Sequence, residues 1–335
     1  MIDADFMPID QIKPREGCRS AIMTEKKAGM SMNMINFQIQ IFLLALTGFV
    51  LGKRKVLDAR TRGHLTDLIL MAALPCSIID SFQMTLSAQI LMSTLSVLLI
   101  SIAIQGLYWI WNRLFYRHEG IDRRICLKYA TMVSNAGFIG MPVCAAVYGS
   151  LGLLYASIFL LPQRIFMWSY GLSMFTAVDG REVVKKVLTH PCIVSIFIGM
   201  AVMALYTYGI QLPDALRETI SSLGACSTPL SMLLTGAILS EVNLRELFQR
   251  QVLLFSLYRL LILPLIVLAV LIVLPLDPLS MKVCVLLTAM PAANTTVMLA
   301  GKYDRDPAFA SELVMTSTLL SLFTIPLISG LLSLI

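Results

Sequence analysis

The chain has 335 residues, of which 57% are hydrophobic and only 14% are charged. A soluble domain carries about 25% charged residues. This composition therefore excludes an ordinary globule in water and predicts a protein embedded in the lipid bilayer. The formal net charge is +6. Its placement in loops beside apolar runs indicates membrane orientation and not a nucleic-acid partner.

The first segment, residues 1–33, is polar and of mixed charge, and it lacks the compact apolar core of a secretory signal. We expect it to be a disordered polar leader. Alternatively, it precedes a true start at Met30, Met32 or Met34. The first apolar run begins near Ile35, so we expect the fold to begin there.

Apolar runs then follow one another along the whole chain. A bilayer core of about 30 Å requires about 20 helical residues. Runs of roughly this length cover residues 35–51, 65–80, 89–111, 126–148, 152–177, 190–209, 215–239, 251–275, 281–301 and 307–334. The sequence therefore predicts an all-α membrane protein with ten transmembrane helices.

The lysines and arginines of the loops predict the orientation of these spans. Nearly all of them lie in the loops after spans 1, 3, 5, 7 and 9, whereas the alternate loops hold only Arg217 and Lys282. Basic loops stay in the cytoplasm. We therefore expect a multi-pass protein of the plasma membrane with both termini outside the cytoplasm.

Ten spans divide into two repeats of five, residues 35–177 and 190–335. An odd number of spans per half forces the halves into opposite membrane orientations, which is the inverted-repeat arrangement of many transporters. Weak echoes support the division: Tyr148 ends span 4 after a Gly/Pro-rich stretch, and Tyr303 ends span 9 after Pro291.

Spans 4 and 9 contain helix-breaking residues at corresponding depths. Proline lacks an N–H donor and clashes with the preceding turn, and backbone freed in this way inside a membrane must face protein or a water-filled cavity. Matched breaks are therefore a pointer to a midplane binding site, although Pro and Gly are also common in ordinary membrane helices. The candidate substrate-binding residues are Asn135, Gly137, Gly140 and Pro142 in span 4, and Pro291, Asn294, Thr295 and Thr296 in span 9.

Two arginines and one acid lie inside apolar runs. A charge at the membrane centre costs about 2.5–3.5 kcal/mol or more, so Arg164, with its neighbour Gln163, and Arg259 are candidates for gripping a substrate carboxylate. The alternative for each arginine is a structural pair or a side chain that reaches the interface. Glu312 is the expected partner of an arginine and a candidate for ion coupling. Asn135 and Asn294 could instead join the broken helices by a hydrogen bond.

The stretch from Asn135 to Pro142, the stretch from Ala289 to Asn294 and the segment from Tyr303 to Pro307 resemble the auxin efflux carrier family. The resemblance covers residues 35–335. It implies broken, crossing helices 4 and 9, in a sodium/proton antiporter-like or bile acid symporter-like architecture. Spans 3–5 and 8–10 would form a moving transport domain. Spans 1, 2, 6 and 7 would form a scaffold that can make a homodimer.

Relatives in that family move carboxylates such as auxin, malate or malonate. The short loop at residues 178–189 and Arg164, near where plant carriers have Gln, favour a bacterial malate or malonate permease over an auxin carrier. We therefore predict a secondary active transporter of a small organic anion that works by alternating access and uses H⁺ or Na⁺ as a coupling ion.

Three other functions are alternatives to transport of an anion. A cation/proton antiporter of related fold would need an acidic pair at the crossing, and spans 4 and 9 contain none. An enzyme would need a catalytic motif, and the sequence has no H-E-x-x-H and no G-x-S-x-G. A ligand-sensing receptor stays open as an alternative. The cysteine and histidine spacing matches no metal site, and we expect no cofactor.

Overall fold

The computed structural model describes residues 39–40, 42–117, 119–176, 180–240 and 249–335, so the predicted leader lies outside the described residues. Within these ranges the chain forms helices and no β-strand. In chain order the helices are Phe42–Lys53, α2 (Ala59–Leu68), α3 (Leu74–Ser81), α4 (Ala88–Phe115), α5 (Ile121–Met132), α6 (Met141–Phe166), α7 (Gly180–Leu188), α8 (Pro191–Thr207), α9 (Asp214–Ala225), α10 (Ser227–Leu239), α11 (Arg250–Leu257), α12 (Leu263–Leu271), α13 (Pro278–Thr288), α14 (Thr295–Lys302) and α15 (Pro307–Leu334).

Six of the described helical stretches are long and apolar enough to cross a membrane. They are Ala59–Ser81, Ala88–Phe115, Ala136–Gly171, Asp214–Leu239, Arg250–Leu271 and Pro307–Leu334. Three shorter apolar helices are Phe42–Lys53, Pro191–Thr207 and Pro278–Thr288. The prediction of an all-α membrane protein is confirmed. The prediction of ten spans is not settled by length, because interruptions divide several of the predicted spans.

Two interruptions account for two of the four predicted spans that do not form long helices, and the other two form the shorter helices Phe42–Lys53 and Pro191–Thr207. The predicted span 126–148 falls into α5 and the first part of Ala136–Gly171, and the predicted span 281–301 falls into α13 and α14. The path of α6 is also broken at Gly149, whose φ of 66° and ψ of −158° are far from helical values. Glycine tolerates this left-handed φ because it has no Cβ.

Wide π-helical turns precede three of the prolines. The turns η2 (Ile69–Ala73), η3 (Ala136–Gly140) and η5 (Tyr258–Ile262) each lead into a helix whose first two residues include a proline. A proline cannot complete the regular hydrogen bond to the residue four positions earlier. A single π turn at that point reroutes the bonds, and such turns are frequent at functional sites.

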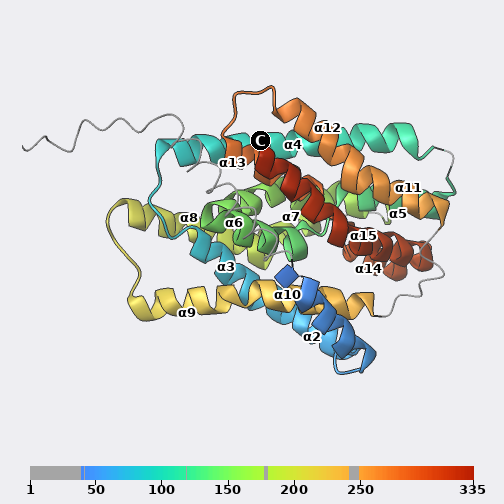
Figure 1. Ribbon diagram of the computed structural model, residues 1–335, viewed down its shortest axis with the longest axis horizontal. Coiled ribbons are helices and arrows are strands. Elements are labelled where there is room, and N and C mark those ends of the chain that lie inside the picture. The colour runs from blue at the N-terminus through green and yellow to red at the C-terminus, as the bar shows by residue number, and fades with distance from the viewer. Residues whose placement is uncertain (1–38, 41, 118, 177–179, 241–248) are drawn as a thin grey trace, which may run out of the picture.

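The helices pack in a bundle whose edges are formed by different parts of the chain (Figure 1). In this view α9 and α10 run along one edge near α2, whereas α4 and α12 lie at the opposite edge, with α6 and α15 between them. The helix Phe42–Lys53 and α10 pack closely through glycines. A Cβ at Gly236 would overlap the carbonyl oxygen of Ala45, and one at Gly48 would overlap that of Leu233. Small residues permit such contacts in membrane proteins.

Candidate substrate site at two interrupted helices

The interruptions between α5 and η3 and between α13 and α14 lie against each other. The backbone N–H of Asn135 donates to the Pro291 carbonyl at 2.7 Å, and the N–H of Ala293 donates to the Val133 carbonyl at 3.2 Å. Ser134 and Ala292 thus face each other as an isolated antiparallel bridge. Each break satisfies backbone groups that the other has freed, which is what a low-dielectric surrounding demands.

A polar side chain from a neighbouring helix anchors each break. The Gln163 amide, on the second part of α6, donates to the Ser134 carbonyl and accepts from the Ser134 hydroxyl, both at 2.9 Å. The Ser317 hydroxyl on α15 accepts from the Ala292 N–H at 3.2 Å. Gln163, predicted as a substrate contact, is therefore engaged in holding the break between α5 and η3.

The two candidate asparagines have different surroundings. The Asn135 residue is 5% exposed, and its side-chain amide forms no hydrogen bond with any residue in the described part of the chain. Asn294 is half-buried at the start of α14, where its carbonyl accepts from the N–H groups of Val297 and Met298. The crossing is thus held by backbone bonds, and the asparagine amides are not used as interhelical links among the described residues.

The Arg164 side chain brings a positive charge to this crossing. The residue is 8% exposed, and a Cβ built at Gly137 would lie 3.5 Å from its Nη2 with no other neighbour within 4 Å. Its Nη1 lies 2.8 Å from Nε2 of His190. Among the described residues, the ion pairs involve other arginines, and no carboxylate lies within ion-pair distance of Arg164.

Glu312, the expected partner of an arginine, has a side-chain amide among its partners. Glu312 lies in the second turn of α15, near the end of that helix and not at its centre, and its Oε1 accepts from Nε2 of Gln249 at 3.1 Å. The start of α15 at Pro307 agrees with the predicted run 307–334, and the ion-coupling role of Glu312 stays a prediction.

The Arg259 side chain has a structural role in these contacts. It is 1% exposed, and its Nη1 donates to the Tyr108 hydroxyl at 2.7 Å and to the Thr288 carbonyl at 2.9 Å. The guanidinium also lies over the Tyr108 ring, 4.9 Å from its centroid. Thr288 ends α13, so Arg259 places a cation at the partially negative end of an interrupted helix. These contacts fit the structural alternative that the sequence left open, and the substrate contact predicted for Arg259 stays a prediction.

The remaining predicted residues support the crossing by packing. A Cβ at Gly140 would come within 2.7 Å of Leu287 Cδ2 and 3.0 Å of Met290 Cγ, so this glycine allows η3 to approach α13 closely. Pro142 is buried at the start of α6, and Thr296 is fully buried on α14.

Tyr129 is a member of this region that sequence reasoning missed. Its hydroxyl donates to the Thr295 hydroxyl at 3.2 Å and so links α5 to α14. The buried ring packs edge-on against Phe175 at 5.3 Å between centroids. In the sequence, Tyr129 lies about one helical turn before the break, and this position could have identified it as a member of the site region.

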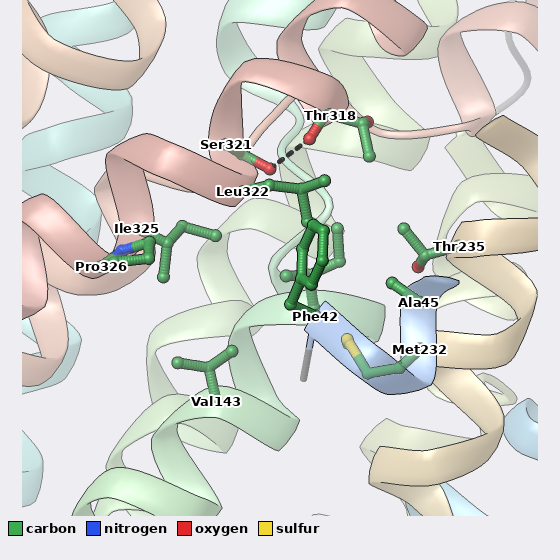
Figure 2. A pocket seen from close by; sticks show the side chains of 11 residues that line it. Phe42, Ala45, Val143, Met232, Thr235, Thr318, Ser321, Leu322, Ile325 and Pro326 are labelled. Atoms are coloured by element: carbon green, nitrogen blue, oxygen red, sulfur yellow. Dashed lines mark hydrogen bonds between the residues drawn. The ribbon is translucent and has the colours of Figure 1, made fainter. Parts of the chain in front are cut away.

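A small cavity of about 30 Å³ lies beside the crossing (Figure 2). It separates α6 and α15 from α10 and the helix Phe42–Lys53, and its lining is Phe42, Ala45, Ile139, Val143, Met232, Thr235, Thr318, Ser321, Leu322, Ile325 and Pro326. Ile139 follows Asn135 by four residues, and Thr318 follows the anchor Ser317. The hydroxyls of Thr235, Thr318 and Ser321 donate to carbonyls of their own helices. This volume holds about one water molecule.

A wider groove of about 330 Å³ adjoins this cavity. It runs between the helix Phe42–Lys53 and α15, shares Phe42 and Ala45 with the cavity, and reaches Lys53 and Leu239.

A bundle of apolar helices in which two interrupted helices pair through their backbones is the arrangement expected of a membrane transporter. Comparison with known families agrees. The family described as "Membrane transport protein" matches residues 34–186 and, a second time, residues 180–329. The chain therefore belongs to this family, that of the auxin efflux carriers, and it is a multi-pass membrane protein.

Two archaeal relatives are similar over nearly their whole length. An uncharacterized transporter of Methanothermobacter thermautotrophicus is 29% identical over 300 residues, which is 86% of this chain and 95% of the relative. An uncharacterized transporter of Methanocaldococcus jannaschii is 20% identical over 299 residues, with the same coverage of both chains. Both are transporters by name, in agreement with the family.

Proposed function

We propose that this protein is a secondary active transporter of a small organic anion, such as malate or malonate, and that the anion binds where the two interrupted helices cross. The observation that carries the proposal is the nearly buried Arg164 guanidinium beside Gly137. Gly137 is two residues after Asn135, whose side-chain amide has no hydrogen-bond partner among the described residues. A coupled ion gradient, of H⁺ or Na⁺, would drive the transport.

The chemistry of these groups favours a carboxylate. A buried cation is costly unless an anion offsets its charge, and a guanidinium matches a carboxylate through two parallel N–H donors. The Asn135 amide can donate to a carboxylate or accept from a hydroxyl, as in malate. The helical segments that begin after the breaks, η3 and α14, add partial positive charge at their N-terminal ends.

The packing of the helices supports a division into two bodies. α3 packs mainly on α8 and α9, whereas α6 packs on α4 and α13, and α15 packs on α11 and α14. The first group, with the helix Phe42–Lys53, α2 and α10, corresponds to the predicted scaffold, through which a homodimer would form. The second corresponds to the predicted transport domain. The cavity in Figure 2 lies between them and holds only about one water, so alternating access requires the bodies to move apart.

The predicted number of spans, their orientation and the repeat also belong to this proposal. Ten spans in two inverted repeats put both termini outside the cytoplasm of a plasma-membrane protein, and the two ranges matched by the family, 34–186 and 180–329, support a division into similar halves. A cation/proton antiporter is less well supported, because residues 133–140 and 289–296 contain no carboxylate.

The test is uptake of labelled malate, malonate and an aromatic acid into proteoliposomes, with and without pH and Na⁺ gradients. We expect the Arg164→Gln and Asn135→Ala variants to lose most uptake while remaining folded. Arg217→Gln is the matched control, because Arg217 is a partly exposed arginine on α9 that pairs with Asp214 at 2.9 Å. If the Arg164→Gln variant moved carboxylates as fast as this control, the proposed site would be wrong.

A further inference from the structure

The imidazole of His190 lies in the turn before α8 and faces Arg164. Arg164 Nη1 is 2.8 Å from Nε2 and 3.3 Å from Nδ1 of His190, and the backbone N–H of Cys192 also points to Nδ1 at 3.3 Å. Hydrogen-bond donors therefore approach both nitrogens of a half-buried ring. Arg164 and His190 come from opposite sides of the α6–α8 contact.

These donors disfavour a protonated imidazole. A neutral ring has one nitrogen that accepts and one that donates, whereas an imidazolium only donates. A protonated His190 would lose its bond from Arg164 and would place a second positive charge 2.8 Å from the guanidinium.

No other described charge lies against the ring. On α7, Arg181 and Lys185 are exposed. On α3, the nearest acid is Asp80, which binds Gln83 beside Tyr206, at the far end of α8. The π turn η2 contains no titratable residue. Among the described side chains, Arg164 is therefore the charge that controls whether His190 binds a proton.

We propose that His190 is the proton-binding residue that couples carboxylate transport to an H⁺ gradient. The proposal rests on the proposed function, in which Arg164 binds the carboxylate. A carboxylate on Arg164 neutralises the guanidinium and offers an acceptor, so His190 can take up a proton at Nε2 and donate it as a hydrogen bond. No covalent bond changes in this step.

The coupling must be reciprocal. If the bound carboxylate raises the proton affinity of His190, a proton on His190 raises the affinity for the carboxylate by the same factor. Substrate and proton then cross together, and the net flux follows the proton gradient. Glu312, the ion-coupling candidate from the sequence, lies instead beside Gln249, in the second turn of α15.

The first experiment follows the His190 imidazole directly. The chain has three histidines, so a His64→Asn/His118→Asn background leaves a single imidazole for NMR titration in detergent. We expect its pKa to rise by roughly one to two units on saturation with malonate, from a typical coupling free energy. It should also rise in the Arg164→Gln variant without malonate. A pKa that stays unchanged while malonate binds would overturn the proposal.

The second experiment measures coupling in transport. His190→Gln keeps an acceptor for Arg164 but cannot titrate, and His190→Asn is a second variant that retains an acceptor for the Cys192 N–H. We expect an acid-outside gradient to accelerate malonate uptake several-fold in the wild type and to leave both active variants unaffected. A variant that keeps the wild-type response to the gradient would refute the coupling role alone. If wild-type protein neither bound nor moved malonate or malate, the proposed function itself would fail, and the coupling with it.

Discussion

The contact between the helix Phe42–Lys53 and α10 makes Gly236 a sensitive position. A Cβ there would overlap the Ala45 carbonyl oxygen and lie 2.7 Å from its carbon and 2.8 Å from the Phe49 nitrogen, where ordinary contact begins near 3.4 Å. These neighbours are backbone atoms, so the helices themselves must separate, by roughly 0.6 Å or more. Overpacking of this kind costs about 1–3 kcal/mol, partly offset by the roughly 0.5–1 kcal/mol that Ala gains over Gly within a helix.

The matched control is Gly106→Ala on α4, where an added Cβ would meet nothing within 4 Å. We expect Gly236→Ala to lower the apparent midpoint of thermal unfolding in detergent by several degrees and Gly106→Ala to raise it by about 1–3 °C. Intrinsic fluorescence during heating measures both. Equal shifts for the two variants would refute the close contact. Because Ala45 lines the cavity beside the crossing, reduced malonate uptake should accompany the loss of stability in Gly236→Ala.

The remaining predictions concern the polar groups around the breaks. Arg259→Gln should destabilise the protein by about 1–3 kcal/mol, measured as a lower unfolding midpoint, because it leaves the buried Thr288 carbonyl unpaired. Gln163→Ala should cost a similar amount, because Ser134 loses partners for both its carbonyl and its hydroxyl; an unchanged midpoint would contradict the anchoring role. Glu312→Gln should leave the response of malonate uptake to a pH gradient intact, and loss of that response would restore this acid as the coupling residue.

The sequence predicted the place of both interruptions because the signals that break a helix are local. Proline and glycine act on their own turn of backbone, so Pro142 and Pro291 marked both interruptions correctly. The family resemblance implied that the breaks cross, and the bond from Asn135 to Pro291 joins them across 156 positions of the chain. The sequence alone contained no local signal for that pairing.

The partners of the buried charges were not predictable in the same way. Arg164 and Arg259 look alike in the sequence, each alone in an apolar run. Arg164 lies beside His190 at the start of α8, whereas Arg259 donates to the Thr288 carbonyl at the end of α13. These roles depend on which helix lies opposite each arginine, which is a property of tertiary packing.

The anchors of the breaks carry information about the repeat that the sequence echoes lack. Each break is held by a side chain from the next predicted span of the chain. This side chain is Gln163 in the first half and Ser317 in the second. Aligning these two anchors places Arg164, the next residue in the first half, opposite Thr318 in the second, and Thr318 lines the cavity in Figure 2. If the halves are inverted repeats, the same position supplies a cation from one side of the crossing and a hydroxyl from the other. An asymmetric pair of this kind suits a ligand with a carboxylate at one end and a hydrogen-bonding group at the other, such as malate.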